Sequence, residues 1–144
     1  MLNDKELLML NLLRQNCRQS LAKISRKIDM PVSTVFDKLA KLEDKFIKKH
    51  TTLIDFAKLG YNIRVNFLIR STSKNDLLSF LQNHKNVNSI YFLQGDFDLY
   101  AETVFKDLKS FEEFLEPLSN LYIIKRKMFY IIEDVKREAF LTNN

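Results

Sequence analysis

The sequence predicts an α+β fold in which an all-helical part comes first and a part with the order βαββαβ follows. Three observations support this prediction. Apolar residues recur at three- and four-residue steps up to Phe46, they alternate with polar residues from Ile63, and Gly60 stands where the pattern changes. With 144 residues, 46% hydrophobic and 28% charged, the chain is expected to be globular, with one ordinary domain or two small ones.

The first predicted helix spans residues 3–16. Asn3 and Glu6 have the spacing of a capping box, in which each side chain accepts a hydrogen bond from the other residue's backbone N–H. This helix has a broad apolar side that can cover the next two helices, formed by Leu7, Leu8, Leu10, Leu12 and Leu13.

The next two predicted helices flank a break at Asp29-Met30-Pro31. Ser20 and Ser33 each precede an apolar-periodic run, where a hydroxyl can cap the first helical turn. Pro31 is expected to set the turn, since proline restricts the residue before it and is excluded from helix interiors. The pattern is that of a helix-turn-helix, but an αα-hairpin in a helical core explains the apolar positions equally well.

The charge is unevenly distributed along the chain. Residues 1–60 contain 12 Lys and Arg against 7 Asp and Glu, whereas residues 61–144 contain 11 of each kind. A positive surface attracts polyanions, although a lysine-rich face is often only a solvated one. Together with the helix pair, this asymmetry favours double-stranded DNA as the partner.

Residues 47–55 are rich in β-branched side chains and are expected to form a wing hairpin or a single strand. In a wing, Lys48 and Lys49 would face the phosphate backbone; a plain exposed hairpin is the alternative. The predicted domains are a winged helix-turn-helix over residues 1–55, a connector over 56–62 and a regulatory and oligomerisation domain over 63–144.

The second domain is expected to be a ferredoxin-like sandwich, an antiparallel sheet with both helices on one face. Both sides of its last strand carry apolar residues, so the uncovered face is expected to need a partner sheet. A homodimer would supply that sheet, and it would prefer a pseudo-palindromic operator. The elements are predicted at 63–70 (strand), 76–84 (helix), 87–94 (strand), 99–105 (strand), 108–118 (helix) and 122–132 (strand).

Several classes of protein are not supported. No run of eighteen apolar residues exists, and the N-terminus is acidic where a signal peptide is basic, so a cytoplasmic protein without membrane attachment is expected. With one cysteine, Cys17, and two histidines, neither a disulfide nor a metal site is expected. We expect no cofactor and no catalytic residues.

From Asp4 to Leu141 the chain resembles the Lrp/AsnC, or feast/famine, transcriptional regulators. The resemblance rests on the order and spacing of three motifs, SLAKISRKIDMPVSTVFDKLAKLEDKFI, IKKHTTLIDFAKLGY and QGDFDLY. It implies a winged helix-turn-helix followed by a ferredoxin-like domain of the RAM/AsnC type. It also implies dimers that often stack into higher oligomers such as octamers.

The resemblance further implies where DNA is contacted. The residues matching the DNA-facing side of the family's recognition helix are Ser33, Thr34, Phe36, Asp37, Lys38 and Lys41. The lysines are expected at phosphates or guanine edges, and Phe36 either touches a thymine methyl group or packs. Asp37 departs from the family, which often has a basic residue near it, and would repel phosphate unless it pairs with Lys41. Lys45 stands where the family often has glycine, so the helix end needs a different turn or a costlier conformation.

Four residues match the turn that helps to line the family's small-molecule site, namely Gly95, Asp96, Phe97 and Asp98. Glycine allows close backbone approach, and carboxylates and exposed N–H groups can hold an amino acid. A simple hairpin turn is the alternative, and Gln94 replaces the threonine often found before this glycine.

The sequence thus predicts a DNA-binding transcriptional regulator modulated by an amino acid or related metabolite. One alternative is an architectural DNA-binding protein without a ligand. A second is an enzyme like the haem-pathway decarboxylases, which share the fold; it is disfavoured because His84 is the regulatory half's one histidine.

Overall fold

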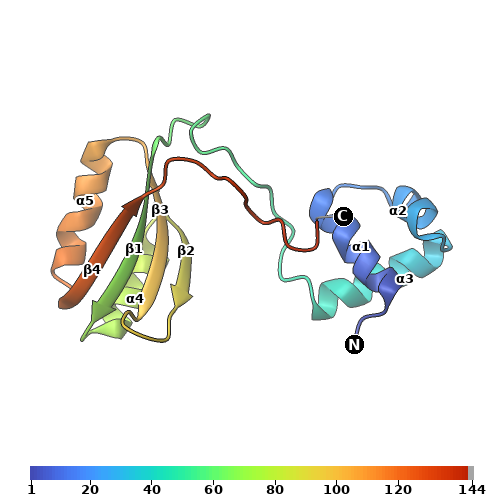
Figure 1. Ribbon diagram of the computed structural model, residues 1–144, viewed down its shortest axis with the longest axis horizontal. Helices are drawn as coiled ribbons and strands as arrows, with labels where there is room; N and C mark the ends of the chain where they lie inside the picture. The colour runs from blue at the N-terminus through green and yellow to red at the C-terminus, as the bar shows by residue number, and fades with distance from the viewer. Residues whose placement is uncertain (143–144) are drawn as a thin grey trace. The chain divides into compact units, whose positions relative to one another are not determined.

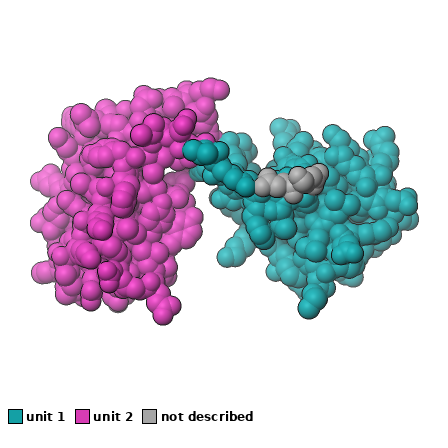
Figure 2. All heavy atoms as spheres, in the orientation of Figure 1, with its two compact units in different colours: residues 1–53, 135–144 teal, residues 54–134 magenta. Residues whose placement is uncertain are grey.

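The computed structural model describes residues 1–142 (Figure 1). The chain divides into two compact units, coloured separately in Figure 2. The helical unit contains residues 1–53 and the described residues from Val135 onward, and the sheet unit contains residues 54–134. The sequence-based division placed residues 63–144 in the second domain, and residues 143–144 lie outside the described residues.

The helical unit consists of α1 (Asp4–Gln15), α2 (Leu21–Ile28) and α3 (Val32–Lys45). The capping box is confirmed, because Glu6 N donates to Asn3 Oδ1 and Asn3 N donates to Glu6 Oε2. The Ser20 cap is also confirmed, with its hydroxyl accepting from Lys23 N at 3.2 Å. These caps satisfy backbone donors that a helix start leaves unpaired.

The turn and the ends of α3 differ in detail from expectation. Asp29, with φ of 50°, ends α2 in the left-handed region, and Pro31 is the N-cap of α3. Ser33 is therefore inside the first turn and caps nothing, because the fixed φ of Pro31 already suits the helix start. After Lys45, Phe46 ends α3 at φ −125°, so no glycine is needed there.

The predicted strand or hairpin over residues 47–55 is absent, since none of these residues belongs to a strand. His50 instead approaches Glu43 of α3, with 3.0 Å between Nε2 and Oε1. Strands need a ladder partner, and β-branched residues alone do not provide one.

The core of the helical unit is entirely aliphatic. It comprises Met9, Leu12, Leu13, Ile24, Ile28, Val35 and Leu42. The returning C-terminal segment is tied to this unit where Arg14 Nη2 donates to the Glu138 carbonyl oxygen at 2.8 Å. The helices therefore meet on their apolar sides, as their periodicity predicted.

The sheet unit confirms the βαββαβ order (Figure 1). Its antiparallel sheet has the strand order β2-β3-β1-β4. Residues from both helices join one core with alternate residues of β1 and β3, so both helices cover the same face. The elements are β1 (Ile63–Ser71), α4 (Lys74–Asn83), β2 (Val87–Phe92), β3 (Leu99–Phe105), α5 (Leu108–Ser119) and β4 (Ile123–Tyr130).

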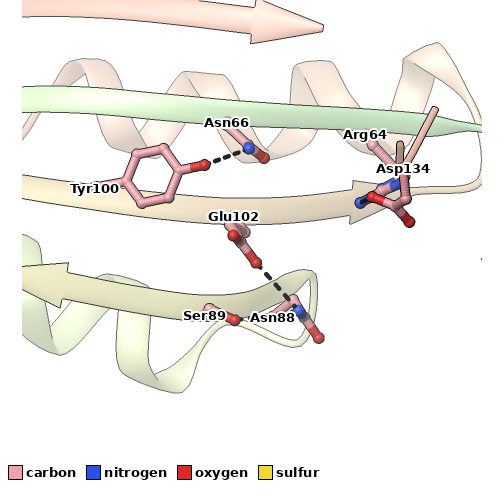
Figure 3. Close-up of polar contacts among 7 residues, drawn as sticks. All are labelled: Arg64, Asn66, Asn88, Ser89, Tyr100, Glu102 and Asp134. Carbon is pink, nitrogen blue, oxygen red and sulfur yellow. Dashed lines mark hydrogen bonds and ion pairs between the residues drawn. The ribbon is translucent and has the colours of Figure 1, made fainter. Parts of the chain in front are cut away.

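The opposite face of the sheet is more polar than expected. Side chains alternate between the two faces of a strand, so Arg64 and Asn66 lie on the face opposite the buried Val65 and Phe67. Glu102 pairs with Asn66 and therefore lies on that open face as well. Figure 3 shows this face, where Asn66 Nδ2 donates to the Tyr100 hydroxyl and Arg64 pairs with Asp134 at 2.9 Å. The prediction of an apolar open face, made from β4, was incomplete, because Phe129 shares this face with Lys125 and Lys127.

Candidate DNA-binding helix and effector pocket

The outward side of α3 is set by which of its residues the core buries. Val35 and Leu42 are buried, so the residues roughly opposite them on the helix face solvent. Among the predicted DNA contacts on α3, Thr34 is half-buried, and the exposed ones are Ser33, Phe36, Asp37 and Lys41. Phe36 is 61% exposed, which is unusual for an aromatic side chain on a helix that already has an apolar side.

Lys38 does not join that exposed side. Its Nζ lies 2.9 Å from Glu6 Oε1 of α1, and both side chains are largely covered. The backbone N–H of Asn3 and the Lys38 ammonium both bind the Glu6 carboxylate, and they lower its pKa. Lys38 therefore fastens α3 to α1, a role that its spacing on the helix did not reveal.

The suggested pairing of Asp37 with Lys41 is not formed among the described residues, where both side chains are exposed. In general a carboxylate can accept a hydrogen bond from a base amino group, but it repels phosphate. Lys48 and Lys49 follow α3 in an exposed irregular segment.

The Gly95–Asp98 turn connects β2 to β3. Gly95 has φ of +130°, a conformation that suits glycine, and a Cβ there would meet nothing within 4 Å. Lys125 lies 3.7 Å from Asp96 and stacks over Phe97 at 4.8 Å from the ring centre. Both contacts join the turn to β4, and each is weak because the side chains of Lys125 and Asp96 are exposed.

Asp98 is the most constrained residue of the turn, with a side chain only 17% exposed. Its Oδ2 accepts from Ser71 N at 3.2 Å, and its Oδ1 lies 3.0 Å from Lys74 Nζ. The Lys74 hydrogen bond is the main cause, and the Ser71 N–H a further one, of the lowered pKa of Asp98.

A pocket of about 720 Å³ opens beside Asp98, within the range of small-molecule sites. Of the four predicted ligand residues only Asp98 lines it; Gly95, Asp96 and Phe97 do not. The rest of its lining comes from the β1–α4 junction and β4, namely Arg70, Ser71, Thr72, Ser73, Lys74, Asn75, Asp76 and Ile124. Sequence reasoning missed the run RSTSKND, whose hydroxyl-rich residues between a strand and a helix could have indicated a polar site.

Other chemistry is poorly supported in the described residues. Their His, Cys, Asp and Glu side chains form no group of three that could hold a metal ion. His84 packs on Phe80 and Phe114, and burial, more than the nearby Lys85, lowers its pKa. None of the described helices has both the length and the apolarity needed to cross a membrane.

Two sequence families match the chain. The model of the Lrp/AsnC ligand-binding domain matches residues 65–139, and that of a winged helix-turn-helix DNA-binding domain matches residues 2–45. Among curated proteins, an HTH-type transcriptional regulator of Pyrococcus horikoshii is 28% identical over 143 residues, covering 96% of this chain and 90% of its own. One from Pyrococcus furiosus is 22% identical over 142 residues, with 96% of each covered.

Solved structures show the same fold. LrpC of B. subtilis has a TM-score of 0.85 and 21% identity, covering 94% of this chain and 98% of its own. A transcriptional regulator from Neisseria meningitidis, solved with L-Met, has a TM-score of 0.85 and 17% identity, covering 95% and 94%. The family is one of DNA-binding regulators rather than enzymes. The chain belongs to the Lrp/AsnC family of helix-turn-helix transcriptional regulators.

Proposed function

We propose that this regulator binds a pseudo-palindromic operator as a cytoplasmic homodimer, using the exposed side of α3, and that an amino acid modulates it. One observation above all supports the DNA-reading part. Phe36 is 61% exposed beside Ser33, Asp37 and Lys41, a mixture of apolar and polar groups suited to base edges.

Each group has a distinct role in this proposal. Phe36 contacts a thymine methyl group, Asp37 accepts from a cytosine or adenine amino group, and Lys41 contacts guanine or phosphate. Ser33 and Thr34 lie in the first turn of α3, the part of a recognition helix that reaches bases. Lys48 and Lys49 contact the phosphate backbone, and Lys38 stays with Glu6.

Operator binding by alanine variants tests this assignment. Phe36→Ala is expected to weaken binding to the selected operator by about 1–3 kcal/mol, the range of a good base contact, and to relax its sequence preference. Lys41→Ala is expected to weaken binding and to reduce the salt dependence. Lys58→Ala, at an 86% exposed side chain outside the helical unit, is the matched control.

If operator affinity is unchanged in both Phe36→Ala and Lys41→Ala, the exposed side of α3 does not contact the operator. A footprint that spreads over any sequence without a palindromic core would instead favour an architectural DNA-binding protein.

The amino-acid part of the proposal rests on the pocket beside Asp98. Asp98 offers a carboxylate to an ammonium group, and Arg70 and the first-turn N–H groups of α4 are available to a carboxylate. The Neisseria meningitidis relative was solved with L-Met, which supports this ligand class. Thermal-shift measurements with each standard amino acid test it, since a selective ligand raises the melting temperature and Asp98→Asn is expected to abolish that rise.

Self-association is proposed through the open face of the sheet. Leu68, Tyr100 and Phe129 supply apolar area on it, and the polar groups around Asn66 would make the interface partly hydrated. Light scattering tests this: Leu68→Lys is expected to shift dimers or larger oligomers, such as octamers, toward monomers. An unchanged mass would place the interface elsewhere.

A further inference from the structure

The Asp98 carboxylate already binds a primary ammonium group of the protein itself. Lys74 Nζ lies 3.0 Å from Asp98 Oδ1, while Ser71 N holds Oδ2 at 3.2 Å. A ligand ammonium that approaches Asp98 therefore meets an oxygen that Lys74 already occupies.

The two partners are held very differently. The Asp98 side chain is 17% exposed and is fixed through the Ser71 N–H and through its own N–H, which donates to the Ile69 carbonyl oxygen at 2.9 Å. The Lys74 side chain is 64% exposed, and an ion pair with so exposed a partner is weak. The carboxylate is thus a fixed subsite, and the lysine can leave it at little cost.

The pocket also offers groups for a carboxylate next to that ammonium. Ser73, the N-cap of α4, makes no side-chain cap, and its hydroxyl donates to Asp76 instead. First-turn N–H groups of α4 therefore lack an intrahelical partner, and the residues of that turn line the pocket together with Arg70. The pocket also contains the carboxylate of Asp76, which the Ser73 hydroxyl binds. Arg70 and the helix N–H groups on one side, and the Asp98 carboxylate on the other, match the two charges of an α-amino acid.

We propose that Lys74 is an internal competitor of the effector: its ammonium occupies the ammonium subsite at Asp98, and an α-amino acid binds by displacing it. The inference rests on the proposed role of Asp98 in effector binding. Competition by Lys74 would lower the affinity of the pocket for the effector, so the effector would need a higher concentration to bind.

Binding measurements on the full-length protein test the competition. Each standard amino acid is titrated against wild type, Lys74→Met, Lys74→Arg and Asp98→Asn. Lys74→Met is expected to bind the effector about two to five times more tightly, the fold-change that corresponds to losing one weak ion pair. Lys74→Arg keeps a cation at Asp98 and is expected to show no gain. Lys109→Met removes a charge from the exposed surface of α5 and is the matched control.

The outcomes separate the inference from the proposed function. Tighter binding by Lys74→Met but not by Lys109→Met supports the competition. Equal or weaker effector binding by Lys74→Met, together with no binding by Asp98→Asn, overturns the competition. Lys74 would then be neutral or would itself bind the effector. Binding that survives in Asp98→Asn, or no binding by any of the proteins, overturns the proposed effector site itself.

Discussion

In the helical unit the buried core is aliphatic and small, whereas in the sheet unit it is built around phenylalanine. Among the residues that the structure describes, seven form the first core and eleven form the second, including Phe67, Phe105, Phe111 and Phe114. The ring centres of Phe67, Phe80 and Phe105 each lie within 5.5 Å of that of Phe114. Such rings bury more area each and interlock, so the sheet unit is expected to be the more stable.

The difference shows how the two tasks are divided. In the proposed interface the helical unit must keep one side of α3 free for DNA, so it has less surface to bury in its core. The proposed effector pocket of the sheet unit lies outside its buried core, because none of the residues that line the pocket belongs to that core. All five tyrosines lie in the sheet unit, so their fluorescence reports that unit alone.

The largest expected effect comes from Phe114→Ala. Truncating this fully buried ring is expected to lower the free energy of unfolding by about 3–5 kcal/mol, because it leaves a cavity among packed rings. Urea unfolding followed by tyrosine fluorescence measures the loss. A loss below that of Leu42→Ala would contradict the comparison of the two cores.

Leu42→Ala is expected to cost about 2–5 kcal/mol, confined to the helical unit. The variant should lose operator binding, since α3 is no longer held in place, while the tyrosine transition stays where it is in the wild type. Circular dichroism and fluorescence recorded on the same samples separate the two units. A tyrosine transition that shifts equally would show that the units unfold together.

Ser20→Ala removes a helix cap and is expected to destabilise the helical unit by about 1 kcal/mol. Ser33→Ala is the matched control, because Ser33 makes no cap in α3 and its loss is expected to change stability by less than about 0.5 kcal/mol. The helical transition in circular dichroism measures both. Equal losses would mean that Ser33 also stabilises a helix start.

The smallest effect concerns pH. The Lys74 and Ser71 hydrogen bonds lower the pKa of Asp98 in the folded protein, so their contribution is present above the unfolded carboxyl's pKa and disappears as the pH falls through the lowered value. The difference in melting temperature between wild type and Asp98→Asn should therefore shrink at acid pH. Asp96→Asn, at an 83% exposed carboxylate, controls for general charge effects. A melting-temperature difference between wild type and Asp98→Asn that grows on acidification would contradict a lowered pKa of Asp98.

Most of the fold could be predicted from hydrophobic periodicity and helix capping. The three helices of the first unit and the βαββαβ order of the second follow from local patterns, as at Asn3, Ser20 and Ile63, because those patterns depend on neighbours in sequence. Residues 47–55 were wrongly expected to form strand, because strand formation also depends on a partner that local composition does not reveal.

The candidate site was less predictable, because its contacts join distant segments. Lys38 and Glu6 are 32 residues apart, and Asp98 and Ser71 are 27 apart. Helical spacing placed Lys38 on a polar side but could not show that α1 covers it. Resemblance led to Asp98, whereas the ion pair between Lys74 and Asp98 appears only when β1, α4 and the turn before β3 are brought together.

The ion pair between Lys38 and Glu6 also bears on how the regulator searches a genome. A lysine neutralised inside the protein releases no counterion from DNA, so it adds nothing to the attraction that any sequence exerts. A genome offers on the order of 10⁶–10⁹ competing sites, and each charge withheld from them lowers the protein's retention on irrelevant DNA. With the proposed base contacts of α3, the internal pair would make operator occupancy depend more on sequence and less on the abundance of DNA.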